Sequence, residues 1–116
     1  MGGQSCVFCQ IVAGELPAKV EFETERVLAF RDINPTAPVH VLVIPKLHIT
    51  DPSELDDATA PVVGEMFRVA HAVAEQLGVA GPGYRLVMNK GRQGGQSVFH
   101  MHLHLLGGRQ MRWPPG

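Results

Sequence analysis

Three histidines on alternate residues constrain the fold of this 116-residue chain more than any other feature of its sequence. The run reads His100-Met101-His102-Leu103-His104-Leu105-Leu106. Successive side chains of an extended strand point to opposite faces, so a strand would place all three imidazoles on one face. Met101, Leu103 and Leu105 would then point into apolar packing. Because a helix would scatter the histidines around its circumference, the pattern predicts a strand over Phe99–Leu106.

A glycine-rich segment, residues 91–97, leads directly into this strand with the sequence Gly-Arg-Gln-Gly-Gly-Gln-Ser. Loops of this kind can expose backbone N–H groups in a concave arrangement that binds anions. Alternating histidines can also form a solvated strand face, and for two histidines that interpretation is preferable. Three histidines behind a glycine-rich loop instead indicate a site at which an imidazole meets a phosphate.

Length and composition predict one soluble globular domain over residues 1–116, since 45% of the residues are hydrophobic and 18% are charged. The formal net charge of −1, without a basic run, gives no electrostatic support for a nucleic-acid or membrane-surface partner. The N-terminus does not resemble a signal peptide, and no apolar run approaches the roughly 18 residues that cross a bilayer. We therefore expect a cytoplasmic location, where the two cysteines would be reduced or bound to a metal.

Apolar patterning and turn residues predict the order of the elements. A short helix is expected from a Ser5 cap to Val12, with Gly14 and Pro17 ending it. Besides the histidine strand, four strands are predicted, at Lys19–Phe22, Arg26–Phe30, Val39–Ile44 and Tyr84–Asn89.

A long helix is predicted to begin at Asp51, which can cap it, with Pro52 in the first turn and Glu54 completing a capping box. Alternatively, Pro61 divides this segment into a short helix and a long one. Gly78 ends the helix, whose apolar stripe consists of Val62, Met66, Phe67, Val69, Ala70, Val73 and Leu77.

This order of elements predicts an α+β fold. We expect an antiparallel sheet of about five strands, with one long and one short helix packed on one side of it. Such a sheet has exposed edges, and one thin sheet does not cover the apolar stripe of the long helix. Pairing of two chains through the long helix and a strand would cover both, so we expect a homodimer.

The histidine run matches the pattern His-φ-His-φ-His-φφ, in which φ is apolar, and so resembles the signature of the histidine triad (HIT) family of nucleotide-binding hydrolases and transferases. The resemblance extends over nearly the whole chain, through residues 28–33, 40–46, 94–98 and the tail 107–116. These segments look like one branch in particular, the histidine triad nucleotide-binding proteins, which are small dimeric purine nucleoside phosphoramidases.

The resemblance implies that His102 attacks the α-phosphorus of an adenosine or guanosine 5′-phosphoramidate. The amine leaves, a nucleotidyl-histidine forms, and water hydrolyses it to the nucleoside monophosphate. No cofactor is expected for catalysis. Imidazole suits this reaction because it is neutral and nucleophilic near pH 7 and leaves well afterwards. Its other nitrogen, Nδ1, should donate to a backbone carbonyl on the His100 strand.

Other residues are expected to neutralise charge at the phosphate. The candidates are His104, Asn89 and, in the glycine-rich loop, Gly95, Gln96 and Ser97. Ser97 can also deliver a proton to the departing nitrogen. His40 is expected to support the triad, of which His100 is the first member, through hydrogen bonds.

The nucleoside needs its own binding groups. By resemblance, Asp32 at a strand end accepts hydrogen bonds from the ribose hydroxyls, although such a residue alone more often caps a turn. Phe8, Ile11, Phe30 and Ile33 would form an apolar slot for the base, and the same side chains can equally belong to the core. Apolar walls discriminate poorly between adenine and guanine, so that preference stays open.

The C-terminal tail, residues 107–116, is expected near the active site of the other subunit, where the resemblance implies that it tunes substrate choice. Trp113 would take part, although a tryptophan between Arg112 and two prolines can also be a plain surface residue. Arg112 departs from the branch, whose members often carry a histidine there, and this leaves the substrate preference open.

Cys6 and Cys9 lie three residues apart, and therefore on one side of a helix or turn. Two thiolates and two imidazoles are a common tetrahedral zinc set, and His48 and His100 are the available partners. The resemblance implies a structural zinc that holds the first helix to the sheet. Two buried, reduced cysteines are the alternative, and a redox pair is disfavoured because the βαβ setting is lacking. His71, in the long helix, is expected to be neither ligand nor catalyst.

The sequence therefore favours a purine nucleoside phosphoramidase acting through His102. Two alternatives remain. One is a dinucleoside polyphosphate hydrolase or phosphorylase from another branch, which the tail argues against. The other is a nucleotide-binding interaction protein whose hydrolysis is incidental.

Overall fold

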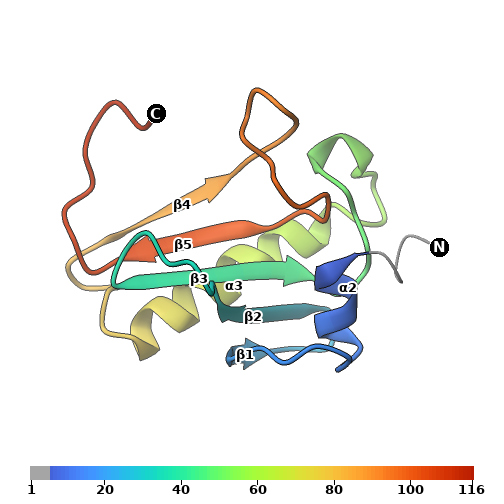
Figure 1. Ribbon diagram of the computed structural model, residues 1–116, viewed down its shortest axis with the longest axis horizontal. Helices are drawn as coiled ribbons and strands as arrows, with labels where there is room; N and C mark the ends of the chain where they lie inside the picture. The colour runs from blue at the N-terminus through green and yellow to red at the C-terminus, as the bar shows by residue number, and fades with distance from the viewer. Residues whose placement is uncertain (1–5) are drawn as a thin grey trace.

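The computed structural model describes residues 6–116, which form an antiparallel sheet with a helix against each face (Figure 1). The elements are, in chain order, helix α2 (Val7–Val12), strands β1 (Val20–Glu23), β2 (Val27–Arg31) and β3 (Val39–Pro45), the 3₁₀ turn η1 (Pro52–Glu54), helix α3 (Pro61–Gln76), and strands β4 (Tyr84–Met88) and β5 (Leu103–Gly107). The expected Ser5 cap lies outside the described residues, and Cys6 is the N-cap residue of α2. Within residues 6–116 no helix is both long and apolar enough to cross a membrane.

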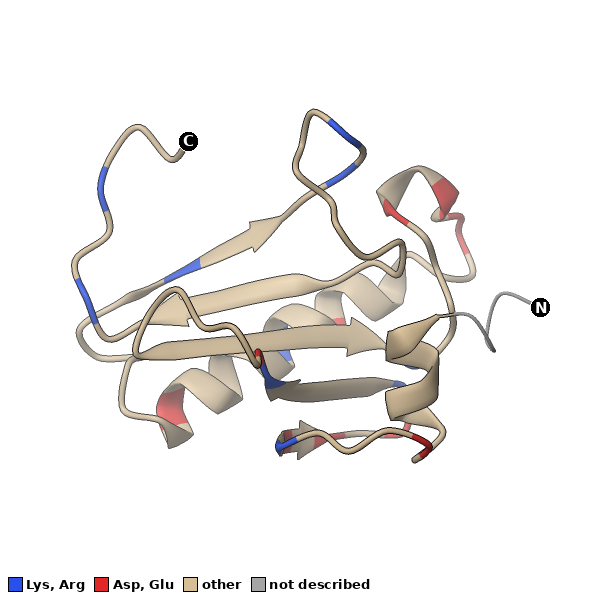
Figure 2. Ribbon diagram, in the orientation of Figure 1, with Lys and Arg blue, Asp and Glu red and all other residues tan. Residues whose placement is uncertain are grey.

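The five strands lie in the order β1-β2-β3-β5-β4, and every neighbouring pair is antiparallel. The α+β class and the five-stranded antiparallel sheet predicted from the sequence are thus confirmed. Within β5, His104 lies opposite Leu42 of β3 and Val87 of β4. Neither β3 nor β5 contains a charged residue, and Figure 2 shows the Lys, Arg, Asp and Glu residues on the surrounding elements.

Strands β2 and β3 are apolar on both faces, and this decides where the helices pack. Alternate residues form a core with α3 on one face, namely Val27, Ala29, Val41 and Val43. The intervening residues form a smaller core around Phe8 of α2 on the other face, namely Leu28, Phe30, Leu42 and Ile44. In Figure 1, α2 lies in front of the sheet and α3 behind it. The expectation that both helices pack on one side is wrong, because strands apolar on both faces need cover on both.

The long helix begins later than its predicted cap. Asp51 caps only η1, where its side chain accepts a hydrogen bond from the Ser53 N–H. The capping box is wrong as well, since the Glu54 carboxylate accepts from the Thr50 N–H, 2.6 Å away, and not from Asp51. Helix α3 starts with Pro61 in its first turn, so the alternative with a divided segment is confirmed. Phe67 is 47% exposed and does not belong to the buried stripe.

The histidine strand is shorter than predicted. Strand β5 begins at Leu103, so only His104 of the three histidines lies in it. The Met101 N–H donates to the Ile49 carbonyl, 2.6 Å away and outside the sheet, which takes the preceding residues out of the strand ladder. Met101, Leu103 and Leu105 are nevertheless buried in the core on the α3 side. The predicted alternation of faces therefore holds although the strand itself does not extend so far.

Candidate active site and metal centre

A pocket of about 560 Å³ opens on the α2 face of the sheet. Its apolar wall comes from α2, the segment after it and the strands, with Phe8, Ile11, Leu16, Phe30 and Leu42. Its polar groups come from the loop after β2, from β3 and from the histidine segment, namely Asp32, Asn34, Thr36, His40, Ser97, His102 and His104. Its size, its largely apolar wall and the few convergent polar groups are typical of a small-molecule site.

His102 presents one free ring nitrogen to this pocket. Its Nδ1 lies 2.7 Å from the backbone carbonyl oxygen of His100. Because a carbonyl oxygen can only accept, Nδ1 carries the proton and donates it, so in the neutral ring the lone pair is on Nε2. The hydrogen bond predicted from the sequence is thus confirmed. His102 is only 5% exposed, and the Phe8 ring meets it edge-on, with centroids 5.2 Å apart.

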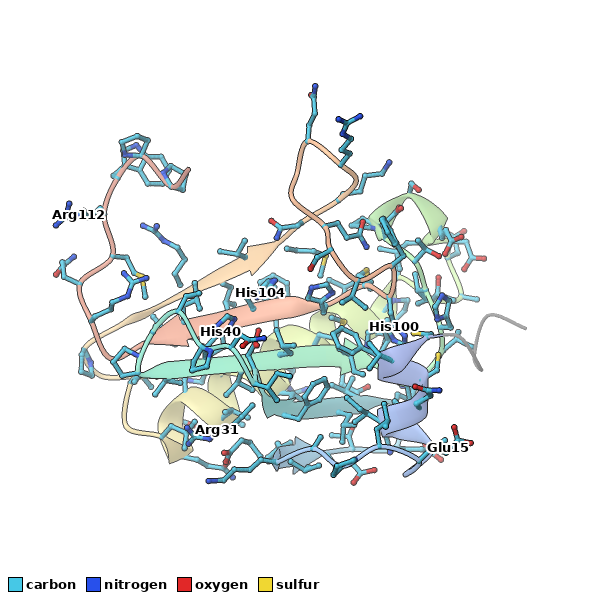
Figure 3. The ribbon with its side chains drawn as sticks, in the orientation of Figure 1. Glu15, Arg31, His40, His100, His104 and Arg112 are labelled. Atoms are coloured by element: carbon cyan, nitrogen blue, oxygen red, sulfur yellow. The ribbon has the colours of Figure 1, made fainter. Side chains whose placement is uncertain are left out.

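A chain of hydrogen bonds sets the tautomers of His40 and His104, which lie next to each other on β3 and β5 (Figure 3). The Thr36 N–H donates to Nδ1 of His40, 3.1 Å away, so the proton of His40 is on Nε2. That Nε2 lies 3.0 Å from Nδ1 of His104 and 3.3 Å from the Asp32 carboxylate. His104 therefore accepts at Nδ1 and carries its own proton on Nε2, where it can donate to a ligand.

Both of these imidazoles are neutral at pH 7. Burial, with smaller contributions from His102 and His40, lowers the pKa of His104 from 6.5 to about 4. Burial also lowers the pKa of His40, although the neighbouring Asp32 opposes this shift. A neutral His40 has one proton to donate, and this is what the chain of hydrogen bonds requires.

The residues expected to hold a nucleoside all belong to this pocket. Asp32, Ile33, Phe8, Ile11 and Phe30 all line it. Asp32 also accepts a hydrogen bond from the Asn34 N–H at 2.8 Å, so the turn-capping interpretation holds beside the binding one. Likewise, Phe8 and Phe30 are core residues as well as pocket walls, whereas Ile33 is 90% exposed at the rim.

The glycine-rich loop contributes less directly than predicted. Ser97 lines the pocket, but Gly95, Gln96 and Asn89 do not. The Gln96 side chain is buried and turned into the protein, where its amide nitrogen donates to the Thr50 and Val98 carbonyls at 2.7 and 3.1 Å. Its amide oxygen accepts from the Gly91 N–H at 2.9 Å. The side chain of Gln96 therefore braces the loop instead of facing a phosphate.

The C-terminal tail does not reach the pocket of its own chain. Trp113 is 81% exposed and is not among the residues that line the pocket. The Arg112 carbonyl accepts a hydrogen bond from Arg85 of β4, 2.8 Å away. A role for this tail in the site of a second subunit stays a prediction.

Some pocket residues were not predicted from the sequence. Thr36 is the most important of them, because its backbone N–H fixes the tautomer of His40. A backbone donor has no signal in the sequence, since its role depends on the path of the loop. Leu16, Pro17 and Ala18 follow α2 and complete the apolar wall, and their place behind a helix gave no reason to single them out.

The four predicted metal ligands come together at the start of α2. Nδ1 of His100 lies 3.3 Å from Sγ of Cys6 and 3.6 Å from Sγ of Cys9, and Cys9 lies 3.2 Å from Nδ1 of His48. In a tetrahedral zinc site with two thiolates and two imidazoles, sulfur and nitrogen ligands are about 3.5 Å apart. The distances between these four residues therefore fit zinc.

The chemistry of the ligand atoms also fits. Nε2 of His100 donates to the Pro45 carbonyl at 2.8 Å, which leaves the Nδ1 lone pair facing the thiols. Burial lowers the pKa of His100 to about 4, so the ring is neutral, as a ligand must be. Burial and the adjacent Cys6 raise the pKa of Cys9 to about 11, so metal binding would release a proton from that thiol.

Comparison with known proteins places the chain in a family. The HIT domain model matches residues 13–111, and the chain therefore belongs to the HIT domain family. It is 49% identical over 112 residues to a 14 kDa zinc-binding protein of Zea mays, covering 95% of this chain and 87% of that protein. It is 48% identical over 112 residues to adenylylsulfatase HINT1 of Arabidopsis thaliana, covering 95% of this chain and 76% of that protein.

A solved structure gives the same result. The crystal structure of a HIT family hydrolase from Legionella pneumophila superposes with a TM-score of 0.93 at 50% identity, over 97% of this chain and all of that one. The family expected from the histidine pattern is thus confirmed. These similarities support a hydrolase activity for this chain.

Proposed function

We propose that this protein hydrolyses purine nucleoside 5′-phosphoramidates to the nucleoside monophosphate and an amine. The observation that carries the proposal is the hydrogen bond from Nδ1 of His102 to the His100 carbonyl. In the neutral ring this leaves Nε2 of His102 as the nucleophilic nitrogen, in the wall of a pocket of about 560 Å³.

In the first step Nε2 of His102 attacks the α-phosphorus. A bond forms between that nitrogen and phosphorus, and the bond from phosphorus to the amine nitrogen breaks. The amine leaves as a neutral molecule only if it gains a proton, and the Ser97 hydroxyl at the pocket edge is the group we assign to this role. His104, with its proton on Nε2, is placed to donate to a phosphate oxygen as charge develops there.

In the second step a water molecule attacks the same phosphorus. The phosphorus–nitrogen bond to His102 breaks, and the proton lost by the water returns to the Ser97 oxygen. The nucleoside monophosphate is released, and the free imidazole is restored. Because imidazole is a good leaving group, this covalent route replaces one difficult displacement by two easier ones.

The nucleoside would bind between the loop after β2 and the apolar side chains of α2 and β2. The Asp32 carboxylate, with one oxygen on the Asn34 N–H, has acceptor capacity left for the ribose hydroxyls. Phe8, Ile11 and Phe30 would hold the purine between apolar side chains. A zinc ion held by Cys6, Cys9, His48 and His100 would supply a structural cross-link between α2 and the sheet.

A second candidate reaction is the hydrolysis of adenylyl sulfate, and the similarity to the adenylylsulfatase of Arabidopsis thaliana favours it. The same nucleotidyl-His102 would form, but sulfate is a stable anion and leaves without a proton. The two reactions therefore differ in their need for an acid. Replacing Ser97 by Ala should slow release of an amine and leave release of sulfate nearly unchanged.

The proposal is tested by incubating the protein with adenosine 5′-phosphoramidate and measuring AMP by chromatography. We expect His102→Gln to lose turnover by at least about 1,000-fold, since the nucleophile is gone. His71→Gln, which changes an exposed histidine of α3 outside the pocket, should behave like the wild type. Mass spectrometry of quenched reactions should find an adenylyl group on His102. Equal turnover by the wild type and His102→Gln would exclude the proposal.

We also propose that the protein acts in the cytoplasm as a homodimer, with the tail of one subunit near the pocket of the other. The exposed Trp113 and the edge strand β4 are consistent with this arrangement. Sedimentation of the full chain, and of a chain ending at Gly107, would establish the oligomeric state and the effect of the tail on turnover.

A further inference from the structure

His100 takes part in two sites at once, the cysteine–histidine cluster and the pocket of His102. Its side chain lies in the cluster with Cys6, Cys9 and His48, while its backbone carbonyl accepts the proton of Nδ1 of His102. The residue is completely buried, so neither group can exchange its partner for bulk water. The metal cluster and the nucleophile are therefore separated by the atoms of a single residue.

The imidazole of His100 is held from several sides. Nε2 donates to the Pro45 carbonyl at the end of β3, Nδ1 faces the two thiols, and the His48 ring packs against it with centroids 4.8 Å apart. The chain around it lies outside the strand ladder, since β5 begins only at Leu103. We infer that the anchored side chain, and not the sheet, sets the position of the His100 carbonyl.

Phe8 provides a second link between the same two places. It lies between Cys6 and Cys9 in α2, and its ring meets the rings of His100 and His102 edge-on at 5.8 and 5.2 Å. Helix α2 has only six residues, far fewer than an isolated helix needs for stability. A cross-link through Cys6 and Cys9 would therefore fix the helix, and with it the ring that contacts His102.

We propose that His100 is a positioning residue through which the cysteine–histidine cluster controls the nucleophile, so that zinc binding accelerates nucleotidyl transfer to His102 and does more than stabilise the fold. The proposal rests on the function proposed above. With the cluster metal-bound, the His100 carbonyl stays on the proton of Nδ1 and keeps the His102 ring oriented so that Nε2 points into the pocket. Without it, His100 and Phe8 are free to move, and His102 occupies the reactive geometry for less of the time.

The expected size of the effect follows from the place of the cluster behind the reacting group. Loss of a residue that orients a reacting or ligating group typically costs 10- to 100-fold. We therefore expect the rate of the first step to fall about 10-fold without metal. Affinity for AMP should fall by less than the rate, because Phe30 of β2 and Asp32 after it also line the nucleotide pocket and do not belong to α2.

The test compares zinc-loaded and chelator-treated wild-type protein with His48→Ala, which removes one ligand whose hydrogen bond and ring contact are with Cys9 and His100 and not with Phe8 or His102. Four quantities are measured: zinc content, the single-turnover rate of adenylation of His102, the Kd for AMP, and the ¹⁵N and ¹H resonances of the His102 ring. We expect zinc to raise the rate in the wild type and to sharpen the signal of the proton on Nδ1. His48→Ala should resemble the chelator-treated protein, and His71→Gln should resemble the wild type.

Two results would overturn the proposal. The first is a zinc-dependent rise in thermal stability with no change in adenylation rate or in the His102 ring resonances. The second is a loss of AMP affinity as large as the loss of rate, since this indicates general loosening of the pocket. If no form of the protein adenylates His102, the proposed function fails, and the resonance of the Nδ1 proton with and without zinc still decides whether His100 couples the two places.

Discussion

Replacement of Gln96 by Glu tests whether this side chain braces the glycine-rich loop. The two residues have nearly the same size and shape, but the carboxylate has no proton to donate at neutral pH. The Gln96 amide nitrogen now donates to the Thr50 carbonyl at 2.7 Å and to the Val98 carbonyl at 3.1 Å. In Gln96→Glu a buried carboxylate oxygen would face these two carbonyl oxygens instead.

The cost of this change can be worked out from the contacts. Two hydrogen bonds are lost, each worth about 1 kcal/mol, and the carbonyls they served are left poorly satisfied at about 1 kcal/mol each or more. We therefore expect a destabilisation of about 4 kcal/mol. For a chain of this length that corresponds to a fall in Tm of roughly 15 °C. When the pH is lowered, the introduced carboxyl group is protonated and regains one donor, so the loss of stability relative to the wild type should become smaller.

The measurement is thermal and urea unfolding of Gln96→Glu beside Gln93→Glu, which makes the same chemical change at an exposed position of the same loop. We expect Gln93→Glu to lie within about 0.5 kcal/mol of the wild type. Turnover of adenosine 5′-phosphoramidate should fall in Gln96→Glu, because Gln96 fixes the loop that leads into Ser97. Equal stability of the two variants at pH 7 would refute the bracing role and favour the prediction from the sequence that Gln96 contacts the phosphate.

Three further predictions concern the pocket. The pKa of His104 is about 4 in the folded chain and near 6.5 when unfolded, so the unfolded state binds protons first and stability falls as the pH drops from about 6.5 to about 4. After allowance for the partial exposure of His104, this pH-dependent stability is worth about 2–3 kcal/mol. Urea unfolding of His104→Gln should therefore depend less steeply on pH than that of the wild type, and parallel curves for the two proteins would contradict the prediction. Asp32→Ala should raise KM for a ribonucleotide substrate by about 10-fold or more, and should raise KM for a 2′,3′-dideoxy analogue less. Equal effects on both substrates would show that Asp32 does not bind the ribose hydroxyls. Phe8→Ala should destabilise the chain by about 3–4 kcal/mol and weaken AMP binding, whereas loss of stability with unchanged Kd would make Phe8 a core residue only.

The sequence by itself determined which side chains share a face and which can share a metal. Alternation at residues 100–105 assigns His102 and His104 to one side and the apolar residues to the other, because side-chain direction in an extended chain depends only on local geometry. The spacing of Cys6 and Cys9 similarly places two thiols together. Gly14 and Gly78, with φ of 78° and 77° after α2 and α3, end the helices as predicted, since glycine adopts this conformation without strain.

Only the tertiary structure decided which partner each of these groups meets. Strand β5 starts at Leu103 because the Met101 N–H binds a carbonyl of a distant segment, and Gln96 turns inward because the Thr50 carbonyl lies behind the loop. The tautomer of His104 depends on the Thr36 N–H, two hydrogen bonds away. Local patterns fix direction along the chain, but a hydrogen bond between distant residues exists only once packing has brought both to one place.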